Sequence, residues 1–165
     1  AFFAKEYGGW QFVEDVALSG AVTEVSPFED GYSYKLVISE ASHNSGSARY
    51  PYFRIKEEDD TYHSMGANSA LGGTTTMLST EVWNAELELT NPRESADFHM
   101  ATVIGGKTSG VIAGTDASAA VDSRSGTFGI GFAAAAKIKS VSVEMSGGSW
   151  DNGTIRVYRR GVSNS

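Results

Sequence analysis

The side chains best suited to chemistry in this sequence are three histidines and a run of four acidic residues. His43, His63 and His99 stand singly, without the HxH or HExxH spacing typical of metal sites. His99, in the alternating segment FHMATVI, is expected to be a half-exposed strand residue. The acidic run, EEDD at 57–60, lies between RYPYFRIK and DTYHS, so we expect it at the exposed tip of a hairpin. A catalytic carboxylate pair needs surroundings that raise one pKa and exclude water, so neither a metal site nor an acid–base pair is predicted.

Other catalytic and cofactor signatures are missing from the sequence. There is no cysteine, which excludes thiolate zinc sites, iron–sulfur clusters and cysteine nucleophiles. Serine is plentiful without a GxSxG motif, and a serine triad assembled only in space stays open as an alternative. EEDDT and WDNGT contain oxygen ligands without a complete calcium loop, and no glycine pair opens a helix after a strand. We therefore predict a non-enzymatic protein with no catalytic residue, cofactor or metal ion.

The charge balance narrows the class of partner. Thirteen Lys and Arg stand against twenty Asp and Glu, a net charge of -7, and no basic run is present to neutralise phosphates. Nucleic acid is therefore not expected as a partner. No apolar stretch approaches about 18 residues, so no membrane span is predicted. The first residues, AFFAKEYGGW, lack the order of a signal peptide, and we expect a cytoplasmic start from which Met has been removed.

Aromatic residues make up 11% of the chain, and their positions separate core candidates from binding candidates. Trp10 and Trp83 fall in phase with the apolar positions of their segments, so we expect both in the core. Trp150, in GGSWDNG, is the strongest candidate for an exposed ring that stacks on a sugar, and Tyr7 and Tyr158 come next. A flat aromatic face suits the apolar side of a sugar ring.

The first nine residues form the other candidate binding element. Phe2, Phe3 and Tyr7 precede the first expected strand, and a Gly-Gly pair provides a hinge before Trp10. Burying a phenylalanine ring against a neighbouring subunit contributes about 2 kcal/mol. We therefore interpret this segment as an arm that grips another virion or subunit surface. The alternative is an arm that folds back on its own domain.

These candidates need elements to position them, and the strongest structural pattern is period-two alternation. Successive side chains of a strand point to opposite faces, so a half-buried strand alternates apolar and polar residues. Ile155 and Val157 are expected to point inward and Tyr158 outward. Four segments show the pattern and are predicted strands: YSYKLVISE at 32–40, EVWNAELELT at 81–90, KIKSVSVEM at 137–145 and TIRVYRR at 154–160.

The intervening segments have turn or loop composition. DNG at 151–153 is predicted to form a tight hairpin turn, because Asn and Gly adopt positive φ angles readily. The regions 65–80 and 105–126 are rich in small residues and are interpreted as long loops with at most one short element each. FAAAAK at 132–137 has helical propensity but is too short to predict a helix.

Together these features predict an all-β fold. We expect a jelly-roll-like sandwich of two antiparallel sheets with about ten strands and long loops rich in Gly, Ser and Thr. The predicted domains are an N-terminal arm (1–9), one sandwich domain (10–160) and a C-terminal tail (161–165). A chain of 165 residues buries about 70% of its unfolded surface, enough for a core without metals or disulfides.

The order of several segments resembles a small β-sandwich module of tailed-phage virion proteins, which closes tail-fibre-like chains or stands alone. The most specific segment is the last, because a strand, a Gly/Ser turn and a final GTIRVY strand close the module in that family. The tail RRGVSNS departs from the family, which ends soon after the final Tyr. The family supplies no catalytic residues. The resembling segments are GGWQFVEDVALSG, DGYSYKLVISEA, YPYFRIK, AELELTNP and KIKSVSVEMSGGSWDNGTIRVY.

The resemblance implies a virion structural or host-facing role after synthesis in the host cytoplasm. Nine residues before the module leave no room for a fibre shaft, so we expect a capsid decoration or cement-type protein on the outside of the virion. Its partner would be the major capsid protein or a head or tail accessory protein, and phage analogy favours a homotrimer. The alternative is a tail-fibre or tail-tip adhesin that binds host-surface glycan through Trp150 and Tyr158. A glycan depolymerase is least favoured.

Overall fold

The segments predicted as strands from their period-two alternation lie in strands of the structure. The computed structural model describes residues 6–7, 9–25, 27–64, 76–109 and 121–162. These ranges contain strands and turns but no helix. Their eleven strands are β1 (Glu6–Tyr7), β2 (Trp10–Ala17), β3 (Val22–Glu24), β4 (Tyr32–His43), β5 (Pro51–Glu57), β6 (Tyr62–Ser64), β7 (Glu81–Leu89), β8 (Ala96–Ser109), β9 (Val121–Ala136), β10 (Ile138–Met145) and β11 (Trp150–Gly161).

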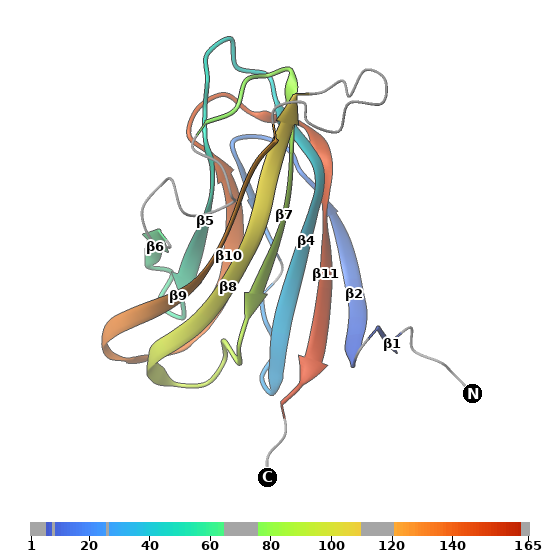
Figure 1. Ribbon diagram of the computed structural model, residues 1–165. Helices are drawn as coiled ribbons and strands as arrows, with labels where there is room; N and C mark the ends of the chain where they lie inside the picture. The colour runs from blue at the N-terminus through green and yellow to red at the C-terminus, as the bar shows by residue number, and fades with distance from the viewer. Residues whose placement is uncertain (1–5, 8, 26, 65–75, 110–120, 163–165) are drawn as a thin grey trace.

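The strands form two antiparallel sheets that pack face to face (Figure 1). The larger sheet has the order β1-β2-β11-β4-β7-β8-β9, and the smaller has the order β3-β10-β5-β6. Because the chain crosses repeatedly between the sheets, β2-β11-β4-β7 and β3-β10-β5-β6 form the two halves of a jelly roll. The predicted antiparallel two-sheet sandwich is confirmed.

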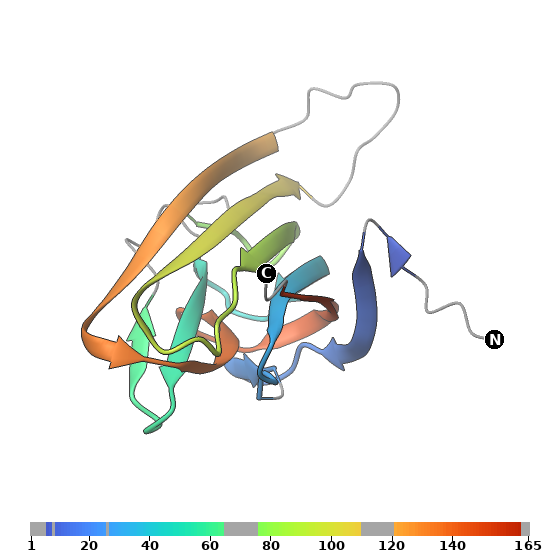
Figure 2. The same cartoon turned by 90° about the horizontal axis from the view of Figure 1, so that it is seen from below.

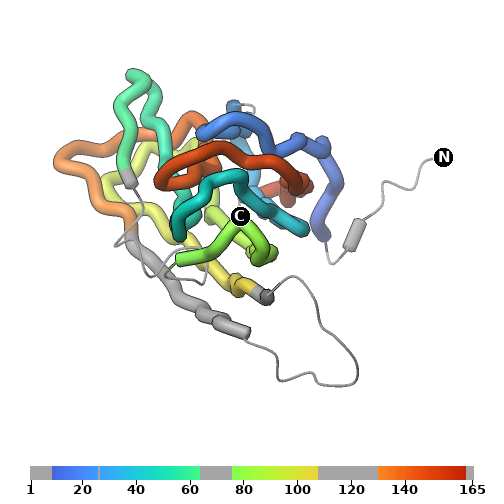
Figure 3. Tube along the Cα trace, turned by 90° about the horizontal axis from the view of Figure 1, so that it is seen from above, coloured from blue at the N-terminus to red at the C-terminus, as the bar shows by residue number. Residues whose placement is uncertain are grey.

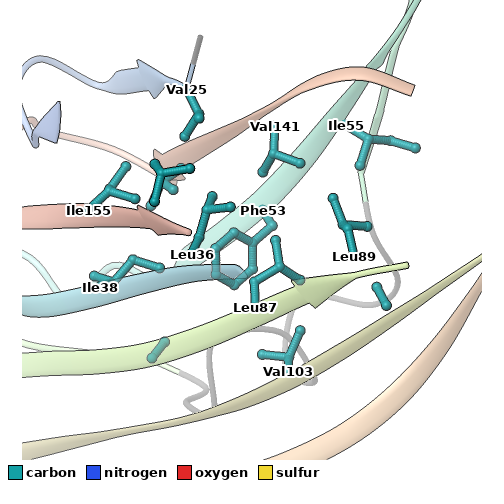
Figure 4. Close-up of a cluster of buried hydrophobic side chains, with 14 of the residues drawn as sticks. Val25, Leu36, Ile38, Phe53, Ile55, Leu87, Leu89, Val103, Val141 and Ile155 are labelled. Atoms are coloured by element: carbon teal, nitrogen blue, oxygen red, sulfur yellow. The ribbon is translucent and has the colours of Figure 1, made fainter. Parts of the chain in front are cut away.

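The core lies between the sheets and is built by the inward positions of the alternating segments. In β7, Trp83, Leu87 and Leu89 are fully buried, and the polar residues between them are more exposed. Figure 4 shows Phe53 of the smaller sheet beside Leu36 and Leu87 of the larger sheet. The alternation that predicted strands therefore also builds a continuous apolar layer.

A long hairpin of β8 and β9 extends the larger sheet beyond the jelly roll (Figure 2). The prediction of a loop over 105–126 is wrong in its described parts, because residues 105–109 belong to β8 and residues 121–126 to β9. Glycine and serine give no apolar–polar alternation, so the pattern was weak although the backbones pair. Residues 132–136 of FAAAAK are also strand, at the end of β9.

Two turn predictions have opposite outcomes. The acidic run is a turn, as predicted, since β5 and β6 pair antiparallel on either side of residues 58–61. The predicted DNG turn is wrong, because residues 151–153 lie inside β11, and residues 146–149 connect β10 to β11 instead. Register shifts between Trp150 and Thr154 mark irregular pairing with β4, and they accommodate the Asn-Gly pair inside the strand.

The first and last described segments both join the larger sheet. Tyr7 lies in β1, whose backbone pairs antiparallel with the start of β2, opposite Trp10. This part of the predicted arm therefore folds back on its own sheet, while Phe2 and Phe3 lie outside the described residues. At the other end, β11 runs to Gly161, one residue past the predicted end of the sandwich.

Candidate functional site

Trp150 is a core residue, so its predicted exposure is wrong. Its ring is 4% exposed and stacks on Trp83, with centroids 5.8 Å apart and an interplanar angle of 14°. Its Nε1–H donates a hydrogen bond to the backbone oxygen of Val143 at 3.2 Å. Trp150 is the first residue of β11 and pairs with His43 of β4. Both side chains are buried. The buried ring is therefore not available to stack on a glycan.

The acidic turn has the electrostatics of a solvated loop. Arg93 donates a hydrogen bond to Glu58 and lowers the pKa of that carboxyl group. The backbone N–H of Thr61 lowers the pKa of Asp59, and an ion pair with Lys139 at 2.9 Å lowers that of Asp60. A general acid needs the opposite shift. These exposed carboxylates are therefore unsuited to acid catalysis.

The histidines have structural partners. The Nε2 atom of buried His43 lies 2.8 Å from the oxygen of Met77, and its Nδ1 accepts the N–H of Ser45 at 3.1 Å. His99 is buried rather than half-exposed, because it faces inward and its Nε2 bonds the oxygen of Ala136 at 2.8 Å. Among the described residues, no group of three or more His, Asp or Glu side chains is arranged to hold a metal ion.

His63 belongs to a small aromatic cluster where the β8–β9 hairpin meets β6. Its Nε2 lies 2.5 Å from an oxygen of Glu57, and its ring packs against Phe132 with centroids 5.4 Å apart. His99 approaches the same phenylalanine ring at 5.6 Å. These contacts tie the hairpin to the smaller sheet, so we interpret the cluster as a structural junction.

The outer face of the smaller sheet contains a buried polar network. Glu144 is 3% exposed, and its carboxylate accepts hydrogen bonds from the Tyr52 hydroxyl at 3.0 Å and from Ser142 Oγ at 2.7 Å. The guanidinium of Arg54 lies 3.4 Å away. Burial, together with the neighbouring carboxylate, raises the pKa of Tyr52. The buried carboxylate thus has hydrogen-bond and ion-pair partners that offset the cost of its burial, and we interpret the network as structural.

The outer face of the larger sheet carries a shallow, open groove that sequence reasoning missed. Figures 2 and 3 show β2 toward one side of this sheet and β8 toward the other, with β11, β4 and β7 between them. Three adjoining depressions there share Val37 of β4 as a lining residue, and we call them together the outer groove. The lining side chains that concern its chemistry are Trp10, Asp15, Lys35, Val37, Ser39, Asn84, Glu86, Ile104, Thr154, Arg156 and Tyr158.

Strand alternation places the floor of this groove on the outer face. Lys35, Val37 and Ser39 of β4 alternate with Leu36 and Ile38, which are buried in the core. The sequence contained this information in the segment YSYKLVISE. The sequence did not show which strands lie beside β4, and those strands supply the remaining walls of the groove.

Trp10 is buried, as expected, but it lies on the outer face and not in the core. The register between β2 and β11 shifts between Val157 and Tyr158, so the alternation of β2 changes face before it reaches Trp10. Lys35 Nζ lies 4.6 Å from the Trp10 ring centroid, and the guanidinium carbon of Arg160 lies 4.5 Å from it. These cation–π contacts cover the indole ring.

Tyr158 points to the outer face, as predicted, and is half-buried. Its ring packs edge-on against Phe12, with centroids 6.1 Å apart and an interplanar angle of 72°. Phe12 is 45% exposed. The two rings form an aromatic rim along the β2–β11 side of the outer groove.

The charged side chains of the outer groove are paired. Lys35 Nζ lies 3.2 Å from an oxygen of Glu86. Arg156 donates from Nε and Nη2 to the two oxygens of Asp15, at 2.9 and 3.2 Å. These hydrogen bonds lower the pKa of Asp15. Lys107, which lines the groove on β8, pairs with Glu81 at 3.1 Å. Each of these pairs sums to zero charge, so each of the three cations has an anionic partner.

An apolar row lies beside the groove on β8. Phe98, Met100 and Ile104 occupy positions of the same parity and therefore share the outer face. Their exposed fractions are 55%, 39% and 57%. We call these three residues the β8 row. Clustered exposed apolar side chains mark interaction surfaces more often than isolated ones do.

No protein-family model matches this chain, and no curated protein matches it in sequence. The described segments also contain no helix of the length and hydrophobicity that crossing a membrane requires. The features of the larger sheet that bear on function are therefore the outer groove and the β8 row.

Proposed function

We propose that this protein is a non-enzymatic virion structural protein of a tailed phage, of the accessory type that decorates the outside of the capsid. The jelly-roll sandwich is an architecture used by viral capsid domains, which makes the proposal compatible with the fold. Fold alone does not determine function. The observation that favours protein docking is the β8 row, three exposed apolar side chains on one strand.

The β8 row suits an interface of modest area that is repeated many times. Burying an apolar side chain of this size contributes roughly 1.5–3 kcal/mol when it passes from full exposure to full burial. Phe98, Met100 and Ile104 already bury part of their surface. Docking would therefore gain less free energy from them than the full burial of three such side chains would give. A decoration protein compensates through many equivalent contacts on the particle.

Attachment to particles tests the proposal. Recombinant protein is added to virions of a phage whose genome lacks the gene for this protein. The amount of protein that co-sediments with the virions is then measured. We expect the wild-type protein to bind and the double variant Phe98→Asp, Met100→Asp to bind at least about tenfold more weakly. Val22→Asp is the matched control, because Val22 is 49% exposed on β3 of the other sheet. No binding by the wild-type protein, or equal binding by the double variant, would overturn the proposal.

A second candidate function is a host-glycan adhesin, and the outer groove is the observation that favours it. Trp150 is excluded from such a site by its burial. Tyr158, in contrast, lines the groove beside polar side chains that can form hydrogen bonds with a ligand. Ile104 belongs to both the β8 row and the groove, whereas Phe98 and Met100 do not line the groove and Tyr158 is not part of the row. Variants at Phe98 and Met100 and variants at Tyr158 therefore test decoration and glycan binding separately.

A further inference from the structure

The outer groove has the size and continuity of a binding site for an extended ligand. Its three depressions have volumes of about 200, 460 and 360 Å³ and meet at Val37. Together they cross β2, β11, β4, β7 and β8, from the aromatic rim to Ile104. Small-molecule sites commonly occupy clefts of roughly 300–1,000 Å³. A chain-like ligand would span the sheet and contact several strands.

The groove offers an aromatic ring next to hydrogen-bonding side chains. Ser39 and Thr154 pair across β4 and β11, and both line the depression that Tyr158 borders. Asn84 lines the adjoining depression, and its Oδ1 accepts the backbone N–H of Glu40 at 2.9 Å, which fixes the orientation of its amide. A sugar residue presents an apolar face of C–H groups and a rim of hydroxyls. The ring and the polar side chains match these two surfaces.

The paired charges select against other ligands. An acidic polymer would need unpaired cations, whereas Lys35 is held by Glu86, Arg156 by Asp15 and Lys107 by Glu81. The net charge of the whole chain, -7, opposes a polyanion further. A protein partner would also fit poorly, because the centres of protein interfaces are depleted of charged residues.

We infer that the outer groove binds a neutral oligosaccharide, with Tyr158 stacking on a sugar ring and Ser39, Thr154 and Asn84 bonding its hydroxyls. The inference specifies the ligand of the second candidate function. It does not depend on attachment to particles, because the β8 residues mutated in that assay, Phe98 and Met100, do not line the groove.

Binding is tested on the full chain with soluble probes. Malto-, cello-, manno- and chito-oligosaccharides serve as the neutral probes, and oligogalacturonate as the acidic control. Tryptophan fluorescence and calorimetry report binding. Trp10 lines the groove, whereas Trp83 and Trp150 are buried in the core, so a change in emission on ligand addition reports the groove. We expect at least one neutral probe to bind and the acidic probe not to bind.

Two variants locate the site. Tyr158→Ala removes the stacking ring and should weaken binding at least about tenfold. Ser39→Trp fills the groove from an exposed position without removing a packing contact and should abolish binding. The matched control is Tyr62→Ala, which removes a 40% exposed ring from the smaller sheet and should bind as the wild-type protein does. Melting temperatures establish that each variant is folded.

A readout on the wild-type protein makes the test independent of variant stability. Backbone amide shifts should change on titration at Val37, Ser39 and Thr154. The inference is overturned if no neutral probe binds at millimolar concentration, if only the acidic probe binds, or if the shifted amides lie outside the groove. Unchanged binding by folded Ser39→Trp would overturn it equally. Failure of particle attachment alone would leave these results unaffected and would count only against decoration.

Discussion

Trp150 anchors the beginning of β11 in the core. Its ring stacks on Trp83, and its Nε1–H bonds the oxygen of Val143. Trp150→Ala removes both contacts and leaves a cavity, so we expect the free energy of unfolding to fall by about 3–5 kcal/mol. Chemical denaturation measures the change. Tyr158→Ala, which truncates a half-buried ring on the outer face, should cost clearly less, and equal losses for the two variants would contradict this assignment of core and surface.

Tyr52 makes the stability depend on alkaline pH. Burial, and then the Glu144 carboxylate, hold the pKa of Tyr52 above its ordinary value of 10.0. The folded protein therefore retains a proton that the unfolded chain loses. This contribution is fully present below about pH 10 and is lost as the pH rises through the folded pKa. We expect the wild-type free energy of unfolding to decline above about pH 10.

The variant Tyr52→Phe should show a shallower alkaline decline, because it removes one of the groups that titrate differently in the two states. A decline should remain, since burial also raises the pKa of Tyr34. Denaturant midpoints measured across the alkaline range provide the comparison. If the two proteins decline with the same slope, Tyr52 does not contribute in this way.

Single residues were predictable where neighbours in the same strand fixed their face. Alternation correctly placed Trp83 inward and Tyr158 outward. Trp150 was misplaced because the turn composition of GGSWDNG put it before the predicted strand at 154–160, whereas β11 begins at Trp150. Alternation itself misplaced Trp10, because a register shift between paired strands is a property of both strands and leaves no mark in the sequence of one.

At the scale of elements, Gly153 shows how closely β11 approaches its neighbours. Its φ is +124°, and a Cβ at this position would lie 2.8 Å from Ala41 Cα and 2.7 Å from Leu18 Cδ1. Gly153→Ala should therefore cost about 1–3 kcal/mol, through backbone strain and displaced strands. Gly161→Ala, in the same strand, is the matched control, because a Cβ there meets no heavy atom within 4 Å. It should change stability by less than about 0.5 kcal/mol.

Thermal and chemical unfolding of the two glycine variants distinguish a local requirement from a general intolerance of β11. Loss of stability in Gly153→Ala alone supports the close approach. A similar loss in Gly161→Ala would show that the strand is sensitive for another reason.

Elements with mixed composition were predictable, and elements made of small residues were not. The segments that became β4, β7, β10 and most of β11 alternate large apolar with polar residues, and their strand structure is confirmed. The far ends of β8 and β9 are rich in glycine, serine and alanine, whose side chains differ too little to show a period. Their strand structure comes from pairing, of β8 with both β7 and β9, which only the folded chain displays.

At the scale of the whole molecule, the sequence predicted two sheets but not the order of the strands. Local alternation indicates how many strands have an apolar face, whereas pairing depends on partners far along the chain. Segments from near the two ends of the chain illustrate this. β2 pairs with β11, and Asp15 of β2 forms an ion pair with Arg156 of β11. The outer groove could not be predicted for the same reason, because its lining comes from strands that adjoin only after folding.

The homotrimer is expected from phage analogy, and an N-terminal arm that grips the neighbouring subunit predicts a change of mass when the arm is removed. Deleting residues 1–8 removes Phe2, Phe3 and Tyr7, together with β1, which pairs only two residues with β2. The sandwich should stay folded, with a melting temperature within a few degrees of the wild-type value, about the shift expected for 1 kcal/mol. Light scattering should report a trimer for the wild-type protein and a monomer for the deletion.

The double variant Phe2→Ala, Phe3→Ala separates the aromatic rings from the β1 strand. It keeps the backbone that pairs with β2 and removes the rings that would be buried against a neighbour, at about 2 kcal/mol each. If the rings hold subunits together, this variant should dissociate as the deletion does. A trimer that survives both changes would place the subunit interface elsewhere, and a monomeric wild-type protein would contradict the arm-mediated trimer itself.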